Sequence, residues 1–110
     1  MAFTPYHNIT GSTGVDIELI ASGENVEAIR SIMITNTHAT ADATVSLFIQ
    51  DNPTAAAAST FYIISTIAIP SDTSLLLDNS TVLSFDNSSN GYGLYLTVGS
   101  SDTLDVMINR

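Results

Sequence analysis

The chain has 110 residues, of which 45% are apolar and 12% charged, and it contains no cysteine and no lysine. This size fits one domain with one core, and the apolar share argues against disorder. Eleven acidic residues against two arginines give a net charge of −9, which disfavours nucleic acid and anionic membranes as partners because both are polyanions. The absence of cysteine excludes a disulfide framework, a zinc thiolate cluster and a thiol nucleophile.

The N-terminal stretch, residues 1–14, carries aromatic residues, a proline and two glycines without any periodicity. We therefore expect an extended N-terminal arm over 1–14 and a sandwich domain over 15–110. Phe3, Pro5 and Tyr6 suit anchoring in a groove on a neighbouring protein, so we expect the arm to be disordered in an isolated subunit. The stretch lacks the basic start and apolar core of a signal peptide, and no apolar run approaches the length of a membrane span, so we expect a soluble protein made without an export signal.

Residues 15–20 alternate apolar with acidic side chains, which predicts a strand with a largely acidic outer face. Two apolar runs, 26–35 and 43–49, then flank a polar loop that is too short for a crossover helix. We expect these runs to pair as an antiparallel hairpin at the centre of the sheet. The core positions expected on this hairpin are Ile32, Ile34, Val45 and Leu47.

The second half of the chain continues with short apolar runs separated by turn sequences. The strands expected there are 61–69, 74–77, 81–85, 94–98 and 104–108, the last two forming a terminal hairpin. The alanine run 55–58 fits a loop better than one helical turn because strands flank it closely. About eight short strands without an amphipathic helix predict an all-β fold, a single antiparallel β-sandwich or jelly-roll-like domain.

No constellation of catalytic residues emerges from the sequence. His7 and His38 are the only histidines, one in the arm and one in a polar loop, and no Gly-x-Ser-x-Gly stretch indicates a serine nucleophile. Asp16 and Glu18 share one strand face, where a solvated acidic surface is the commoner explanation. We expect no enzymatic activity, no cofactor and no catalytic or metal-binding residue.

The stretch Asp86-x-Ser88-x-Asn90-Gly91 matches the first six positions of a calcium-binding loop in spacing. The match ends at the twelfth position, where Thr97 stands in place of the bidentate glutamate. A glycine-bearing turn explains the same residues, so we expect that calcium is not structural here.

The order of strands and turns resembles that of small β-sandwich virion proteins of tailed bacteriophages. The likeness lies in Ala28-Ile29-Arg30-Ser31-Ile32-Met33-Ile34-Thr35-Asn36-Thr37 and an Ala/Thr loop, followed by the runs 43–47, 67–70, 74–77 and 104–108. It covers roughly residues 15–109 and is carried by strands and turns. It implies a non-enzymatic structural subunit of a virion. The subunit would be a capsid decoration (cement) protein on the major capsid protein, or else a component of the neck, tail or fibres.

Such proteins are typically homo-oligomeric, and the resemblance suggests a trimer. The run from Phe61 to Ile69 is apolar on both faces, so one face can serve the core while Tyr62 and Ile64 point outward to a second copy. We expect Ile64→Glu to dissociate the oligomer without unfolding the subunit. The further alternative, a carbohydrate-binding sandwich, would require the tyrosines to gather on one surface, and their scatter in the sequence argues against it. The tyrosines are Tyr6, Tyr62, Tyr92 and Tyr95.

Overall fold

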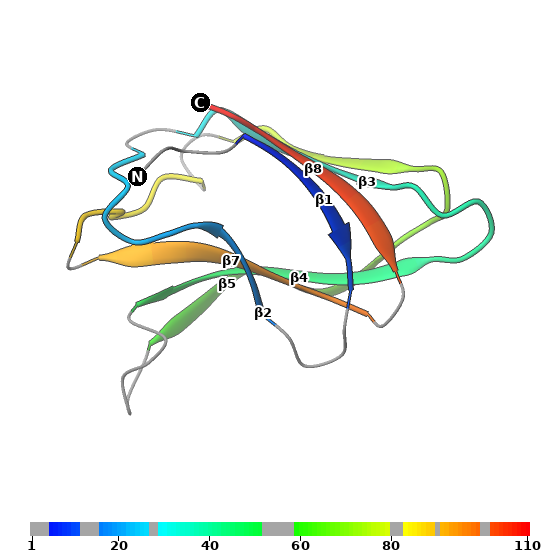
Figure 1. Ribbon diagram of the computed structural model, residues 1–110, viewed down its shortest axis with the longest axis horizontal. Helices are drawn as coiled ribbons and strands as arrows, with labels where there is room; N and C mark the ends of the chain where they lie inside the picture. The colour runs from blue at the N-terminus through cyan, green and yellow to red at the C-terminus, as the bar shows by residue number, and fades with distance from the viewer. Residues whose placement is uncertain are drawn as a thin grey trace.

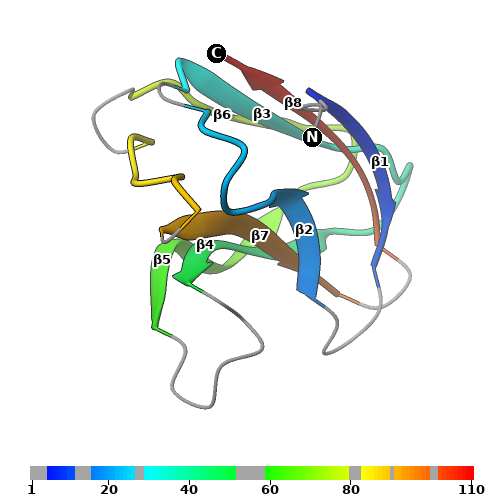
Figure 2. The same cartoon turned by 60° about the vertical axis from the view of Figure 1, so that its left-hand side comes forward.

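A computed structural model of the chain describes residues 5–11, 16–26, 29–51, 59–79, 83–89, 91–99 and 102–110. In these parts the chain forms eight strands in two sheets that face each other (Figures 1 and 2), and it forms no helix there. The strands are β1 (Tyr6–Thr10), β2 (Asp16–Ile20), β3 (Ser31–Asn36), β4 (Ala43–Asp51), β5 (Thr60–Ile69), β6 (Ser74–Leu77), β7 (Tyr92–Val98) and β8 (Thr103–Asn109). The predicted all-β sandwich of about eight strands is confirmed.

The strands pair in a nested order. Sheet A has the order β1-β8-β3-β6 and sheet B the order β2-β7-β4-β5, and every pair is antiparallel. Thus β4 pairs with β5, β3 with β6, β2 with β7 and β1 with β8, as if one long hairpin had been rolled up. Rolling adds the pairs β4·β7 and β3·β8, which join the strands of each sheet. This nested order of eight strands is the jelly-roll topology.

The core lies between the two sheets and is built from alternate residues of the strands. In β3, Ile32 and Ile34 are fully buried while their neighbours are partly exposed, as expected for one face turned inward. Val45 and Leu47 of β4 meet them from the opposite sheet and are also fully buried. The prediction that these four residues line one core is confirmed.

The predicted central hairpin is wrong, because β3 belongs to sheet A and β4 to sheet B. The loop between them crosses from one sheet to the other and is held by the buried amide of Asn36. Its Nδ2 donates to the carbonyl oxygens of Ala41 at 2.8 Å and Ile69 at 2.9 Å, and its Oδ1 accepts from the backbone N–H of His38 at 3.0 Å. The short polar loop therefore spans the sandwich instead of turning within one sheet.

The predicted terminal hairpin is wrong for the same reason, since β7 lies in sheet B and β8 in sheet A. Among the described strands, only β4 and β5 are consecutive in the chain and also paired. The predicted strand 81–85 is wrong for residues 83–85, which begin with a turn and lie outside both sheets. The alanine run 55–58 lies outside the described residues.

The predicted arm over residues 1–14 is wrong for Tyr6–Thr10, which form β1 and pair with β8 along their whole length. Ile9 is buried in the core at 7% exposure, and the backbone N–H of Ile108 donates to the carbonyl oxygen of Pro5 at 2.8 Å. The sandwich therefore includes part of the stretch assigned to the arm. The sequence of β1 shows no clear alternation of apolar and polar residues, because Ile9 is the one buried residue among the five of this strand.

Asn87 is a second buried amide, and it joins three segments. Its Oδ1 accepts from the backbone N–H of Val26 at 2.9 Å, and its Nδ2 donates to the carbonyl oxygens of Ala21 at 2.9 Å and Tyr92 at 2.8 Å. Its own carbonyl oxygen accepts from the backbone N–H groups of Gly23 and Asn25. The segment 21–26 leads from sheet B to sheet A, so Asn87 fixes this crossing to the start of β7.

Candidate functional site

The most exposed apolar side chains of sheet A lie in one row across its outer face. Tyr6 of β1 is opposite Met107 of β8, Met107 is opposite Met33 of β3, and Met33 is opposite Leu76 of β6. Tyr6 is 71% exposed, Leu76 54% and Met107 39%, and Met33 is half-buried. We call these four residues the apolar row. It spans all four strands and borders a shallow groove of about 380 Å³.

A polar row runs beside the apolar row, two residues further along each strand. Asn8 Nδ2 donates to Asp105 Oδ1 at 2.6 Å, and the hydroxyl oxygens of Thr35 and Ser74 lie 2.8 Å apart. These contacts hold the carboxylate of Asp105 on the outer face of β8. On this side of the apolar row, polar side chains are therefore hydrogen-bonded across neighbouring strands, and Asp105 contributes a negative charge.

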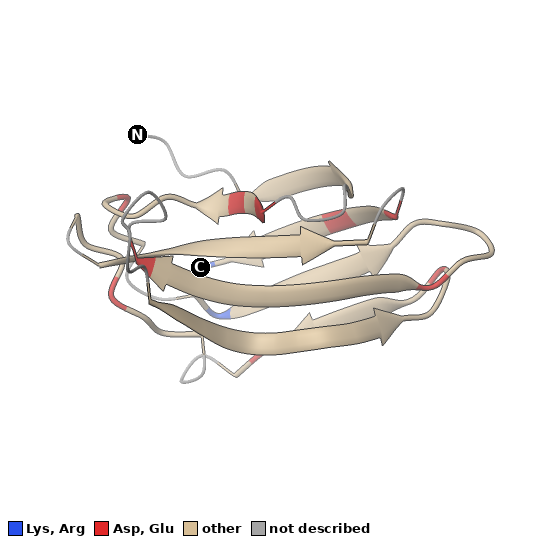
Figure 3. Ribbon diagram, turned by 90° about the horizontal axis from the view of Figure 1, so that it is seen from below, with Lys and Arg blue, Asp and Glu red and all other residues tan. Residues whose placement is uncertain are grey.

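The opposite side of the apolar row carries uncharged polar side chains. Ser31 and Asn109 are the next outward pair, and the backbone N–H of Arg30 donates to the carbonyl oxygen of Asn109 at 2.7 Å. Arg110 follows at the end of β8, so the chain's only two basic residues are neighbours here. Figure 3 shows basic residues only near the C-terminus, whereas acidic residues are spread along the molecule. Both arginines stand one residue beyond this pair, so alternation along β3 and β8 does not place their side chains on the face that carries Met33 and Met107.

The outer face of sheet B carries an aromatic row. The ring of Phe48 lies 5.9 Å from that of Tyr95 on β7 and 5.2 Å from that of Tyr62 on β5. The neighbours cover Phe48, which is 3% exposed, while Tyr62 is 58% exposed. The Tyr95 hydroxyl donates to Glu18 Oε2 at 3.4 Å, and burial together with the negative charge of Glu18 raises the pKa of Tyr95.

Polar side chains flank the aromatic row on both sides. On one side Gln50 Nε2 donates to Thr60 Oγ1 at 2.7 Å. On the other side the Ser46 hydroxyl accepts from the backbone N–H of Thr66 at 2.8 Å. The outer face of sheet B therefore offers the exposed ring of Tyr62 beside amide and hydroxyl groups.

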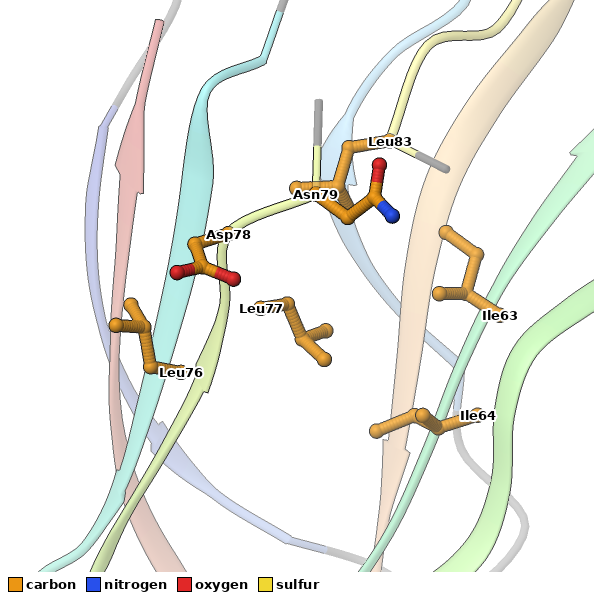
Figure 4. A pocket seen from close by; sticks show the side chains of 7 residues that line it. All are labelled: Ile63, Ile64, Leu76, Leu77, Asp78, Asn79 and Leu83. Carbon is orange, nitrogen blue, oxygen red and sulfur yellow. The ribbon is translucent and has the colours of Figure 1, made fainter. Parts of the chain in front are cut away.

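A third feature is an apolar pocket of about 240 Å³ between the edge strands β5 and β6 (Figure 4). Ile63 and Ile64 line it from β5, and Leu77 faces them from β6. The pairing of β5 with β4 shifts register on both sides of Leu47, so the simple alternation along β5 is broken and adjacent isoleucines line the same pocket. The prediction that Ile64 shares an outward face with Tyr62 is wrong.

The residues predicted to form an interface do not come together. Tyr6 belongs to the apolar row and Pro5 precedes it, whereas Tyr62 lies on the other sheet and Ile64 packs against the core. Phe3 lies outside the described residues. Sequence reasoning missed Met33, Leu76 and Met107, although the alternation of Met33 and Met107 with buried neighbours was a usable signal.

The two histidines and the Asp86 turn are engaged locally. His38 Nδ1 accepts from the backbone N–H groups of Thr40 and Ala41, each at 3.1 Å, while His7 lies on β1. Hydrogen bonds from the Ser88 side chain and backbone lower the pKa of Asp86. In the parts of the chain that the structure describes, no three His, Asp or Glu side chains gather as metal ligands would. Asn90 lies outside those parts.

Comparison of the chain with models of known protein families, with characterised proteins and with solved structures finds no match. Within the described residues there is no helix of the length and apolarity needed to cross a membrane.

Proposed function

We propose that the protein is a non-enzymatic structural subunit of a bacteriophage virion, a capsid decoration protein that forms homo-oligomers and binds the major capsid protein. The observation that carries this proposal is the apolar row on the outer face of sheet A. A contiguous apolar strip across a soluble domain marks a surface that another protein covers. Nucleic acid and membranes are not its partners in this proposal, since the chain carries a net charge of −9.

The topology supports the same class of function. Jelly rolls serve as capsid domains of viruses and also as lectins, and a fold alone does not decide between such uses. The likeness in strand and turn order to small virion proteins, seen in the sequence, favours the first. The link to a virion therefore rests on the order of strands and turns in the sequence. The apolar row supports the part of the proposal that a protein partner covers this surface.

Quantitative mass spectrometry of purified virions tests the proposal. We expect the chain in particles from a lysate of the phage that encodes it, at a copy number proportional to that of the major capsid protein. A labelled antibody should decorate the whole capsid surface in electron micrographs. Absence of the chain from purified particles would refute a virion role, and label confined to the neck, tail or fibres would assign it to those parts instead.

A carbohydrate-binding module is the second candidate, and the aromatic row favours it. The structure brings Tyr62 and Tyr95 together around Phe48, although they are distant in the sequence, while Tyr6 lies on the other sheet. An exposed aromatic ring with amide and hydroxyl neighbours is a suitable surface for stacking a sugar. A glycan array tests this: binding that Tyr62→Ala abolishes would support the second candidate, and an array without signal would reject it.

A further inference from the structure

We infer that the loop between β3 and β4, residues 37–42, is a pH-sensitive element of the fold (Figure 1). The neutral imidazole of His38 holds the loop in place, and uptake of a proton by this ring releases the backbone of Thr40 and Ala41 from it. The inference goes beyond the proposed function and does not rest on it, because it concerns the response of the fold to pH and not the partner of the apolar row.

The loop is held by a ring nitrogen that accepts two hydrogen bonds. His38 Nδ1 accepts from the backbone N–H of Thr40 and from that of Ala41, each at 3.1 Å, and the Thr40 hydroxyl lies 3.5 Å from the same nitrogen. An imidazole nitrogen accepts a hydrogen bond only when it carries no proton. The loop therefore requires a neutral ring whose proton is on Nε2. A second proton on Nδ1 would set an N–H group against two other N–H groups.

The same loop has a second anchor that does not titrate, the buried amide of Asn36. Asn36 Oδ1 accepts from the backbone N–H of His38 at 3.0 Å, and Asn36 Nδ2 donates to the carbonyl oxygen of Ala41 at 2.8 Å. Ala41 is thus bound through its N–H by the ring and through its carbonyl oxygen by the amide. We expect acid to release the N–H groups of Thr40 and Ala41 and to leave the N–H of His38 on Asn36.

The charges around the loop do not oppose a proton on the ring. The segments in contact with the loop are the turn 70–73 and the start of β8, through the bonds from the Asp72 N–H to the His38 carbonyl oxygen and from the Thr37 N–H to the Thr103 carbonyl oxygen. The charged side chains on the loop, on this turn and along β8 from residue 102 to 109 are all carboxylates: Asp42, Asp72, Asp102 and Asp105. The two arginines stand at the ends of β3 and β8 that are remote from the loop. Opposition to the proton therefore comes from the two backbone N–H groups.

The pH range of the effect separates histidine from the carboxylates. Histidine is the side chain that ordinarily changes its charge between about pH 5 and pH 8, whereas carboxylates ordinarily take up protons near about pH 4. A change between about pH 7.5 and pH 5.5 therefore reports on the histidines. The chain has two of them, His7 and His38, and mutation distinguishes them.

Nuclear magnetic resonance of the isotope-labelled protein tests the inference. At about pH 7.5 the ring of His38 should carry its proton on Nε2. On lowering the pH to about 5.5, hydrogen exchange of the Thr40 and Ala41 amides, corrected for the intrinsic rate at each pH, should become about tenfold faster, as expected for the loss of one hydrogen bond. The corrected exchange of the His38 amide should stay the same, because its acceptor is Asn36.

Two variants provide matched controls. In His38→Asn the side-chain oxygen can accept from the loop N–H groups at every pH, so the corrected exchange of Thr40 and Ala41 should no longer depend on pH. His7→Gln removes the other histidine and should leave the response of the wild type unchanged. Circular dichroism identical to that of the wild type shows that each variant is folded.

Four results would overturn the inference. These are a His38 ring with its proton on Nδ1 at neutral pH, corrected exchange of Thr40 and Ala41 that is the same at both pH values, a folded His38→Asn protein that keeps the full pH response, and a His7→Gln protein that loses it. Faster exchange throughout both sheets at the lower pH would also contradict it, since acid would then unfold the whole domain instead of releasing one loop.

Discussion

At the scale of single residues, two buried asparagines explain how the chain passes between its sheets. A crossing segment leaves the hydrogen-bonded ladder of one sheet before it joins the next, so its backbone groups need other partners. Asn36 supplies them to the loop after β3, and Asn87 supplies them to the segment before β3. An amide suits this role because it both donates and accepts.

Asn87→Ala should lower the free energy of unfolding by about 2–4 kcal/mol, because it removes the side-chain partner of the buried N–H of Val26 and one hydrogen bond to each of the carbonyl oxygens of Ala21 and Tyr92. Chemical denaturation measures the change. Asn8→Ala is the control, since Asn8 is exposed and its side chain makes one hydrogen bond, to Asp105, so we expect a loss of less than about 1 kcal/mol there. Equal losses in the two variants would contradict the bridging role of Asn87.

Tyr95 should titrate above the ordinary range of a tyrosine, because burial and the charge of Glu18 disfavour its phenolate. Since its folded-state pKa lies above its unfolded-state pKa, its contribution to stability is complete below the unfolded-state pKa and is lost as pH rises through the folded-state pKa. Tyrosinate absorbance against pH measures this, and Tyr95→Phe removes the late-titrating component. Glu18→Gln should shift that component to lower pH, and an unshifted curve would contradict the contact.

At the scale of elements, the sequence predicts strands better than it predicts their partners. Alternation located β2 and β8 closely, because one buried face imposes a period of two. The predicted strand 26–35 is wrong at its start, because β3 begins at Ser31 and the described residues before it lie outside both sheets. Partner choice is decided by the nested order of the jelly roll, which pairs β1 with β8 over most of the chain's length. A short polar loop looks the same in a sequence whether it turns within a sheet or crosses between sheets.

The irregular register of β5 against β4 leads to a prediction for Ile64 that is opposite to the one from simple alternation. Ile64→Glu should prevent folding or lower the unfolding free energy by more than about 2 kcal/mol, because the carboxylate would enter the apolar pocket beside Ile63 and Leu77. Ser65→Glu, at the exposed next position, is the control and should change stability by less than about 0.5 kcal/mol. A stable, folded Ile64→Glu protein would show that this side chain faces outward.

The assignment of β1 to the sandwich is tested at Ile9. Ile9→Ala should cost about 2–4 kcal/mol, because it removes a buried side chain from the core. Thr10→Ala, at an exposed position of the same strand, should cost far less. If thermal unfolding of both variants matched that of the wild type, β1 would belong to a detached arm.

At the scale of the whole molecule, function depends on which faces remain uncovered once the two sheets have packed. Tyr6 could be identified from the sequence as an exposed aromatic residue, but Met33, Met107 and Leu76 could not be grouped with it. They join it only because β1, β8, β3 and β6 are neighbours in sheet A. Conversely, Ile64 looked exposed because its alternation was counted without the irregular register of β5.

The central claim is that the apolar row is the assembly surface, and oxidative footprinting of assembled against dilute protein tests it most directly. Met33 and Met107 both lie in the row, so their oxidation, followed by mass spectrometry, should be strongly suppressed on assembly. Tyr62 and Phe61 on sheet B should be modified equally in both states. Unchanged oxidation of both methionines together with protection of Tyr62 and Phe61 would contradict the account and move the assembly surface to sheet B.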